Sequence, residues 1–165
     1  MANERCFGGV RPDAGNPPDF VETSVMLTLT QRACLRAAVD RIIPPGDGFA
    51  GAAEAGVLDY LLGQFERDLS GALPMYRSGL DALDAEARAA GAPLAFAELL
   101  PGAQDALLAR VEAGDVAAKA AWDNEPTLFL RQLVEHAHEG YWADPGNGGN
   151  KNEVAWKMIG FKVTA

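Results

Sequence analysis

The chain has 165 residues, a formal net charge of −9 at pH 7 and an isoelectric point near 4.6. That length is typical of one domain with a substantial apolar core. Nucleic acid and anionic lipid carry negative charge, so the acidic chain is not expected to bind either. The chain also lacks the run of about 18 apolar residues that a membrane-spanning helix needs.

The composition favours helix over sheet. Alanine is very common, and leucine, glutamate and arginine are frequent, whereas valine and isoleucine are comparatively sparse. No long stretch alternates apolar and polar residues, so we expect no sheet. We therefore predict an all-α fold, a small domain of about five to seven helices with an extended N-terminal arm and a glycine- and asparagine-rich C-terminal loop.

The extended arm is predicted over residues 1–27, and the single helical domain over residues 28–165. Glycine and proline are dense in the arm, and no periodic pattern appears there. Its first 16 residues have neither the apolar stretch of a signal peptide nor paired arginines. Cys6 lies in the arm and Cys34 in the first helical pattern. The two form no metal motif, and a bridge between them would need an oxidising compartment.

The first helix is predicted to begin at Thr30 as the N-cap. Its apolar face repeats at i, i+4, i+7 and i+8. That face consists of Leu35, Val39, Ile42 and Ile43. The following Pro44-Pro45 pair stops the helix, because the residue before a proline is pushed out of the α region. A turn-rich loop then extends to Gly51.

Two helices are predicted next, over residues 52–69 and 72–90, because apolar residues recur there at helical spacing. These residues are Val57, Leu58, Leu61, Leu62 and Phe65 in the first helix, and Tyr76, Leu80, Leu83 and Ala87 in the second. Gly91 suits the position after a helix C-cap. The carboxylates of the second helix are expected on a solvated face. They include Asp81, Asp84 and Glu86.

A short helical turn is predicted at residues 96–99. A fourth helix should follow over residues 101–114, with Pro101 at its first position, where the missing N–H of proline costs nothing. Residues 117–122 form a short segment rich in alanine.

A fifth helix is predicted to begin at Pro126, with Asn124 or Glu125 as its N-cap, and to end at Gly140. Its apolar residues again repeat at helical spacing and should face inward. They are Phe129, Leu130, Leu133, Val134 and Ala137.

The two histidines, His136 and His138, lie two positions apart and point away from each other on a helix, so they cannot chelate one metal. Glu135 and His138 do share a face, but di-iron sites in helix bundles need two Glu-x-x-His pairs and two further glutamates. A helical metal-dependent enzyme that uses Glu135, His138 and Glu139 is therefore kept as the alternative hypothesis.

Motifs for common cofactors and nucleophiles are absent from the sequence. It has no Gly-x-Gly-x-x-Gly after a strand, no Walker loop and no Gly-x-Ser-x-Gly. The loop Gly146-Asn147-Gly148-Gly149-Asn150 lacks the lysine and hydroxyl of a phosphate cradle, and tight turns explain it better. We assign no catalytic, cofactor-binding or metal-ligating residue to this chain.

Aromatic and methionine side chains crowd the segment that surrounds this loop. Core packing explains some of them, and a docking patch at a protein interface explains the others. We predict that this region contacts a partner protein. The candidate interface residues are Tyr141, Trp142, Asp144, Pro145, Asn147, Gly149, Asn150, Trp156, Met158 and Phe161.

Three stretches also carry a family resemblance. The first contains Val39-Asp40-Arg41-Ile42-Ile43-Pro44, Asp47 and Glu54-Ala55-Gly56-Val57-Leu58-Asp59-Tyr60. The second contains Tyr76-Arg77-Ser78-Gly79-Leu80-Asp81-Ala82-Leu83, Phe96-Ala97-Glu98-Leu99 and Gln104-Asp105-Ala106-Leu107-Leu108. The third and most specific contains His136, Glu139-Gly140-Tyr141-Trp142-Ala143-Asp144-Pro145, Gly148-Gly149-Asn150 and Trp156-Lys157-Met158-Ile159-Gly160-Phe161. Together, in this order, they resemble the gluconate 2-dehydrogenase subunit 3 family over residues 29–161.

The resemblance implies a non-catalytic small subunit that binds, stabilises and helps mature or export a large dehydrogenase. The implied partner is a glucose–methanol–choline (GMC) oxidoreductase that carries FAD and oxidises a sugar, polyol or glycoside, often with a cytochrome c as electron acceptor. It also implies the periplasm, reached by export together with the partner. This chain lacks the twin-arginine signal of many members, which leaves the cytoplasm as the alternative. Leu100 stands where the family tends to have a small polar cap.

Overall fold

The computed structural model describes residues 26–91 and 93–163, and within these residues it confirms the all-α prediction. The described residues form seven α-helices and five short 3-10 turns, and they form no strand. The helices are α1 Leu29–Ile42, α2 Ala52–Ala55, α3 Val57–Phe65, α4 Leu73–Ala89, α5 Pro101–Glu112, α6 Pro126–Trp142 and α7 Val154–Met158. The 3-10 turns are η1 Ser70–Ala72, η2 Phe96–Glu98, η3 Lys119–Ala121, η4 Pro145–Asn147 and η5 Lys151–Glu153. Of the predicted arm, only Met26 and Leu27 lie within the described residues, and Leu27 is fully buried.

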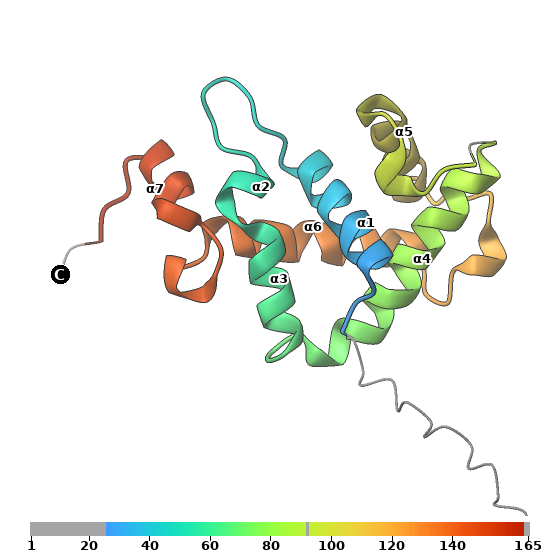
Figure 1. Cartoon of the computed structure of the whole chain (residues 1–165), viewed down its shortest axis with the longest axis horizontal. Coiled ribbons are helices and arrows are strands. Elements are labelled where there is room, and N and C mark those ends of the chain that lie inside the picture. Colours follow the sequence, from blue (N-terminus) through green and yellow to red (C-terminus); the bar gives the residue numbers. More distant parts are fainter. Residues whose placement is uncertain (1–25, 92, 164–165) are drawn as a thin grey trace, which may run out of the picture.

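The central element is α6, which contacts each of the other α-helices. It runs along the long axis of the molecule behind α1 and α3, and α7 lies at one end (Figure 1). Because its apolar residues fall on one stripe, α6 can bury that stripe against several partners at once. Phe129, Leu133 and Ala137 are all fully buried. No described helix has the length and apolar character to cross a membrane.

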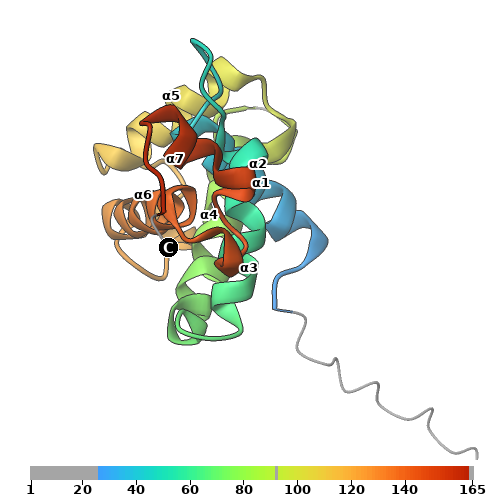
Figure 2. The same cartoon turned by 90° about the vertical axis from the view of Figure 1, so that its left-hand side faces the viewer.

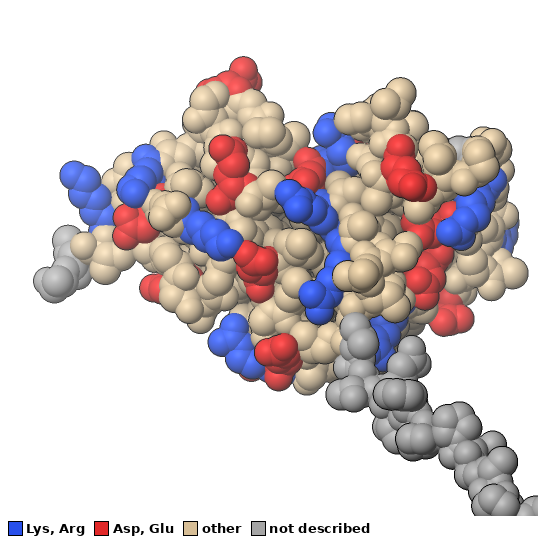
Figure 3. Space-filling view, viewed as in Figure 1, with Lys and Arg blue, Asp and Glu red and all other residues tan. Residues whose placement is uncertain are grey.

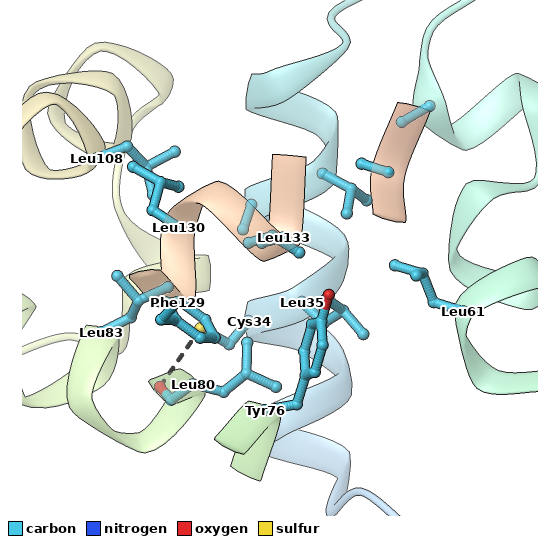
Figure 4. Packing of buried hydrophobic residues seen from close by; sticks show 14 of the residues in the cluster. Cys34, Leu35, Leu61, Tyr76, Leu80, Leu83, Leu108, Phe129, Leu130 and Leu133 are labelled. Atoms are coloured by element: carbon cyan, nitrogen blue, oxygen red, sulfur yellow. Dashed lines mark hydrogen bonds between the residues drawn. The ribbon is translucent and has the colours of Figure 1, made fainter. Parts of the chain in front are cut away.

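The core lies where α1, α3, α4 and α6 meet, and Figure 4 shows its side chains interlocking. The ring of Tyr76 packs against Phe65 at 4.7 Å and against Phe129 at 6.0 Å between ring centroids. Beside them the buried thiol of Cys34 donates to the Leu80 carbonyl at 3.6 Å. Burial and the nearby carboxylates raise the pKa of this thiol, so Cys34 acts as a small buried apolar residue.

Two carboxylates of α4 contradict the prediction of a solvated face. Asp84 and Glu86 are buried, whereas Asp81 is exposed. Glu86 accepts hydrogen bonds from the backbone amides of Ala117 and Ala118 at 2.9 and 2.8 Å, and from the Trp122 indole at 3.1 Å. Asp84 likewise accepts from the Phe96 amide at 2.8 Å. Such donors offset the cost of burying a carboxylate, and here they fix the loops on either side of α5.

The bounds of two predicted helices were wrong. In both cases a glycine lies where a side chain would clash with a residue distant in the sequence. Residues 52–69 form not one helix but α2 and α3, separated by Gly56 at φ 73°. Gly140 lies inside α6, because a Cβ there would be 2.6 Å from the ring of Tyr60. The predicted positions of Pro101, Pro126 and Gly91 are confirmed.

The N-cap of α1 is Thr28 rather than the predicted Thr30. The Thr28 hydroxyl accepts a hydrogen bond from the backbone N–H of Gln31 at 3.1 Å. In return, the side-chain oxygen of Gln31 accepts one from the backbone N–H of Thr28 at 3.0 Å. This reciprocal capping box satisfies two donors that the first turn would leave free. Leu29, at the first helical position, is exposed, so the apolar pattern alone did not mark the start.

Replacing Thr28 with alanine should lower the free energy of unfolding by about 1 kcal/mol, because the Gln31 amide loses its acceptor. The matched control is Thr30→Ala, a threonine two positions later on the exposed first turn of the same helix. Urea denaturation of the two variants measures the difference. Equal effects of the two substitutions would contradict the assignment of the cap.

Candidate functional site

Large apolar side chains are exposed together at one end of the molecule. We call this surface the apolar end and define it as Phe49, Trp142, Met158, Ile159 and Phe161. Their exposure reaches 60% at Ile159 and 52% at Phe49 and Phe161. Figure 2 looks at this end and shows α7 in front, with the loop between α1 and α2 above it. Clustered exposed apolar side chains of this kind mark interaction surfaces.

Phe49 reaches the surface on a tight turn. The backbones of Gly46 and Phe49 bond to each other, with N···O distances of 3.3 and 2.8 Å. Asp47 and Gly48 between them have φ of 50° and 83°, as a type I′ turn requires. The base of the loop is fixed by the Tyr141 hydroxyl, which donates to the Ala50 carbonyl at 2.7 Å. The turn therefore presents Phe49 in one defined position beside α6.

Gly149 allows the chain after α6 to return against the helix. A Cβ at Gly149 would lie 2.0 Å from the carbonyl oxygen of Gly140, so only glycine fits this approach of two backbones. The backbone N–H of the next residue, Asn150, donates a hydrogen bond to the same Gly140 oxygen at 3.1 Å. Two small residues at facing positions thus let the C-terminal segment, residues 143–163, pack directly on α6.

Asn150 organises the C-terminal segment from inside. It is fully buried, and its backbone adopts the left-handed conformation at φ 42°. Its side chain donates to the Ala143 carbonyl at 3.1 Å and accepts from the Ala155 amide at 2.9 Å. One amide side chain thereby joins the end of α6 to the start of α7, which fixes where α7 lies.

Further contacts hold α7 and the turns before it. The Lys151 ammonium pairs with Asp59 of α3, and its aliphatic chain covers Gly56 so closely that a Cβ there would be 2.7 Å away. The Trp156 indole donates to the Trp142 carbonyl at 3.1 Å, and its ring packs against Phe161 at 5.1 Å. The apolar end is therefore built on fixed backbone rather than on a loose tail.

Hollows lie on both sides of the ridge formed by Phe49 and Met158. One, of about 370 Å³, is lined by these two side chains together with Trp142 and Ile159. The other, of about 820 Å³, also borders Glu54 and Lys157. A surface that combines an apolar ridge with hollows can receive the side chains of another polypeptide.

Basic and acidic side chains both surround this end, although the chain as a whole is acidic. The sequence has four lysines, at positions 119, 151, 157 and 162, and three of them lie in the C-terminal segment. Figure 3 shows basic side chains over α7 and the turns before it, with acidic side chains among them. Lys151 pairs with Asp59, and Lys157 lies 3.8 Å from Glu153. The lysines thus offset part of the negative charge of the chain at this end.

The predicted interface residues divide into surface and interior positions. Trp142, Met158 and Phe161 are exposed on the apolar end, Asp144 and Asn147 are exposed on the loop, and Pro145 and Trp156 are half-buried. Tyr141, Gly149 and Asn150 are buried in the chain itself, where they hold the segment in place. The contact of all these residues with a partner stays a prediction. Tyr141, Gly149 and Asn150 would influence binding through the surface that they hold in place.

Two members of the apolar end, Phe49 and Ile159, were not predicted as interface residues. The Asp47-Gly48 pair, a strong signal for a tight turn, was the one clue in the sequence that Phe49 projects. Nothing in the sequence pattern separates the exposed Ile159 from a core isoleucine, since exposure here depends on how α7 packs.

The residues of the metal-enzyme alternative lie along α6, and His138 also borders the smaller hollow of the apolar end. Glu135 and His138 share one face, as predicted, and line a groove of about 790 Å³ between α1, α5 and α6. Glu139 is exposed but does not line that groove. Within the described residues, no three or more His, Cys, Asp or Glu side chains are grouped so that they could hold a metal ion. The geometry therefore offers the alternative no support.

His136 turns in the opposite direction from His138, toward the core. Its Nδ1 lies 2.8 Å from the Tyr76 hydroxyl, and the two rings stack at 5.9 Å. Burial, followed by Glu139 and Glu135, raises the pKa of Tyr76, so this tyrosine stays protonated and can donate to the histidine. This hydrogen bond gives the buried Tyr76 hydroxyl a partner. It explains why a tyrosine, which carries a polar group, is tolerated at the centre of the core.

A family model described as gluconate 2-dehydrogenase subunit 3 matches residues 30–162. This range includes all the helices except the first residue of α1, and it includes the whole apolar end. No match was found among curated proteins or among solved structures.

Proposed function

The chain belongs to the gluconate 2-dehydrogenase subunit 3 family, and on that premise we propose that it is a non-catalytic small subunit of a sugar-oxidising complex. The proposed partner is a large FAD-dependent dehydrogenase of the GMC type, acting on a sugar or glycoside. FAD and the catalytic residues belong to the partner, and a cytochrome c takes the electrons from it. This chain binds the large subunit, stabilises it and assists its maturation.

The observation that carries this proposal is the family match over nearly the whole chain, since the family is one of dehydrogenase subunits. The apolar end supports it independently. Exposed aromatic and aliphatic side chains on a fixed backbone are costly in water, and burial against a large partner removes that cost. The proposal further places the complex in the periplasm, exported together with the large subunit.

Co-expression tests the proposed function. The affinity-tagged chain is produced together with a large FAD-dependent GMC-type dehydrogenase of the same organism, and that flavoprotein is also produced without it. We expect the two to co-purify as a yellow complex, and the soluble, flavin-loaded dehydrogenase to fall at least tenfold when the small subunit is omitted. A flavoprotein that folds, loads FAD and reaches its compartment equally well alone would contradict the proposal, and fractionation of the cells distinguishes periplasm from cytoplasm.

A further inference from the structure

The proposed function leaves open which surface binds the large subunit. We infer that the apolar end is that surface, and that it receives a polypeptide segment of the large subunit that presents bulky apolar side chains flanked by carboxylates. The inference rests on the proposed function for the identity of the partner. The location and chemistry of the surface come from the residues themselves.

The first argument is the concentration of apolar exposure. Phe49 and Met158 form a ridge with a hollow on each side, and Trp142 and Ile159 complete the wall of one of them. Other exposed large apolar side chains, such as Leu29 and Leu100, line none of the described hollows. Interfaces gain most of their affinity from a few large apolar side chains that fill such pockets.

The second argument is rigidity. The backbone under the apolar end is fixed by Gly149 against Gly140, by the buried Asn150, and by the hydrogen bond from Tyr141 to the loop that bears Phe49. A surface that is already ordered loses little conformational entropy when a partner binds. This arrangement suits a lasting complex between two folded chains.

The charges around the apolar end favour one kind of occupant. Lys157 and Lys162 border this surface. Lys157 lies 3.8 Å from Glu153 and Lys151 pairs with Asp59, so Lys162 is the lysine best placed to meet a carboxylate of the partner. A second copy of this chain would place the same lysines against each other, and its charge of −9 would add repulsion. The same net charge opposes an anionic membrane. A partner segment that carries carboxylates around an apolar centre complements both features, with Glu54 as the one acidic side chain lining the adjoining hollow.

The experiment measures binding of purified variants to the large flavoprotein by biolayer interferometry. Phe49→Asp and Ile159→Asp should each weaken binding at least 30-fold, because they place a charge in the apolar contact. Lys162→Glu should weaken binding several-fold at low salt. Its effect should be smaller at high salt, because salt screens exposed charges. Leu100→Asp and Leu29→Asp are matched controls at side chains that are 79% and 85% exposed outside the apolar end, and both should bind like the wild type. Circular dichroism checks that all five variants are folded.

The outcomes separate this inference from the proposed function. If the wild type binds and the apolar-end variants bind equally well, the location is wrong although the function stands. If the wild type binds no large flavoprotein, the proposed function fails first. Two further results would contradict the large subunit as the occupant of this surface. These are sedimentation of a wild-type dimer that Ile159→Asp abolishes, and flotation of the wild type, but not of Phe49→Asp, with phosphatidylcholine–phosphatidylglycerol vesicles.

Discussion

Replacing Gly149 with alanine should release the C-terminal segment from α6 and lower the free energy of unfolding by about 3 kcal/mol. The added methyl carbon would lie 2.0 Å from the Gly140 carbonyl oxygen and 2.9 Å from its carbonyl carbon. Both atoms belong to the backbone of a central helix, so no side chain can rotate away to make room. The segment must move instead, and the hydrogen bond from the Asn150 amide to Gly140 breaks with it.

The loss should be visible in stability and in local protection. For a domain of this size about 3 kcal/mol corresponds to a fall in Tm of roughly 6–12 °C. Hydrogen exchange should show rapid exchange of the Ala155 amide, which is buried and bonded in the wild type. The control is Gly102→Ala in α5, where a Cβ would meet nothing within 4 Å and alanine favours the helix. Unchanged protection of residues 150–158 in Gly149→Ala would contradict the packing described.

A second variant reaches the same segment by a different route. Asn150→Ala removes the acceptor of the Ala155 amide and the donor to the Ala143 carbonyl, and it leaves both groups buried without partners. We expect both Asn150→Ala and Gly149→Ala to weaken binding of the large subunit, although both positions are buried and lie beneath the surface. Asn124→Ala, at an exposed asparagine just before α6 and outside the predicted interface, should leave binding unchanged.

The sequence predicted the long amphipathic helices well because their periodicity survives any tertiary context. The apolar stripe of α6 and the prolines that begin α5 and α6 lie where the pattern placed them. It failed where two segments meet. A glycine such as Gly140 is typical of a helix end, yet Gly140 lies inside α6, because the ring of Tyr60 occupies the space that a side chain would fill.

The candidate site shows the same division. The crowding of Trp142, Met158 and Phe161 near the C-terminus was visible in the sequence, and all three are exposed. The distinction between these and the buried Asn150 was not visible, because the buried position depends on the return of the chain against α6. Phe49 joins the apolar end from a loop more than 90 positions away from Trp142 in the sequence, a proximity that local patterns do not encode.

Gly79→Ala should destabilise the domain by about 3 kcal/mol through the crossing of α4 and α6. A Cβ at Gly79 would lie 2.3 Å from Cδ2 and 2.4 Å from Cε2 of Phe129. That ring is fully buried and packs on Tyr76 at 6.0 Å and on Trp122 at 5.8 Å, so it has no free space to enter. The helices must separate, and the gain in helix propensity from alanine, about 1 kcal/mol, does not compensate.

A smaller side chain at position 129 should rescue this variant. Phe129→Leu alone loses apolar contact and leaves a cavity, which lowers the free energy of unfolding. In the double variant the alanine methyl occupies part of that space. Its loss of unfolding free energy should therefore be about 2 kcal/mol smaller than the sum of the losses in the two single variants. Chemical denaturation of the wild type, both single variants and the double variant measures this coupling energy.

The control for helix propensity is Gly63→Ala in α3. Its Cβ would meet only the terminal nitrogen of Arg67, at 3.5 Å, which is an ordinary contact. This substitution should stabilise the domain by up to about 1 kcal/mol, since alanine restricts the unfolded chain and favours the helix. The same chemical change thus has opposite signs in two helices of one domain, because only Gly79 faces a fixed ring. Additive losses in the double variant would mean that Phe129 moves aside freely, and that glycine is not required for the close approach of α4 and α6.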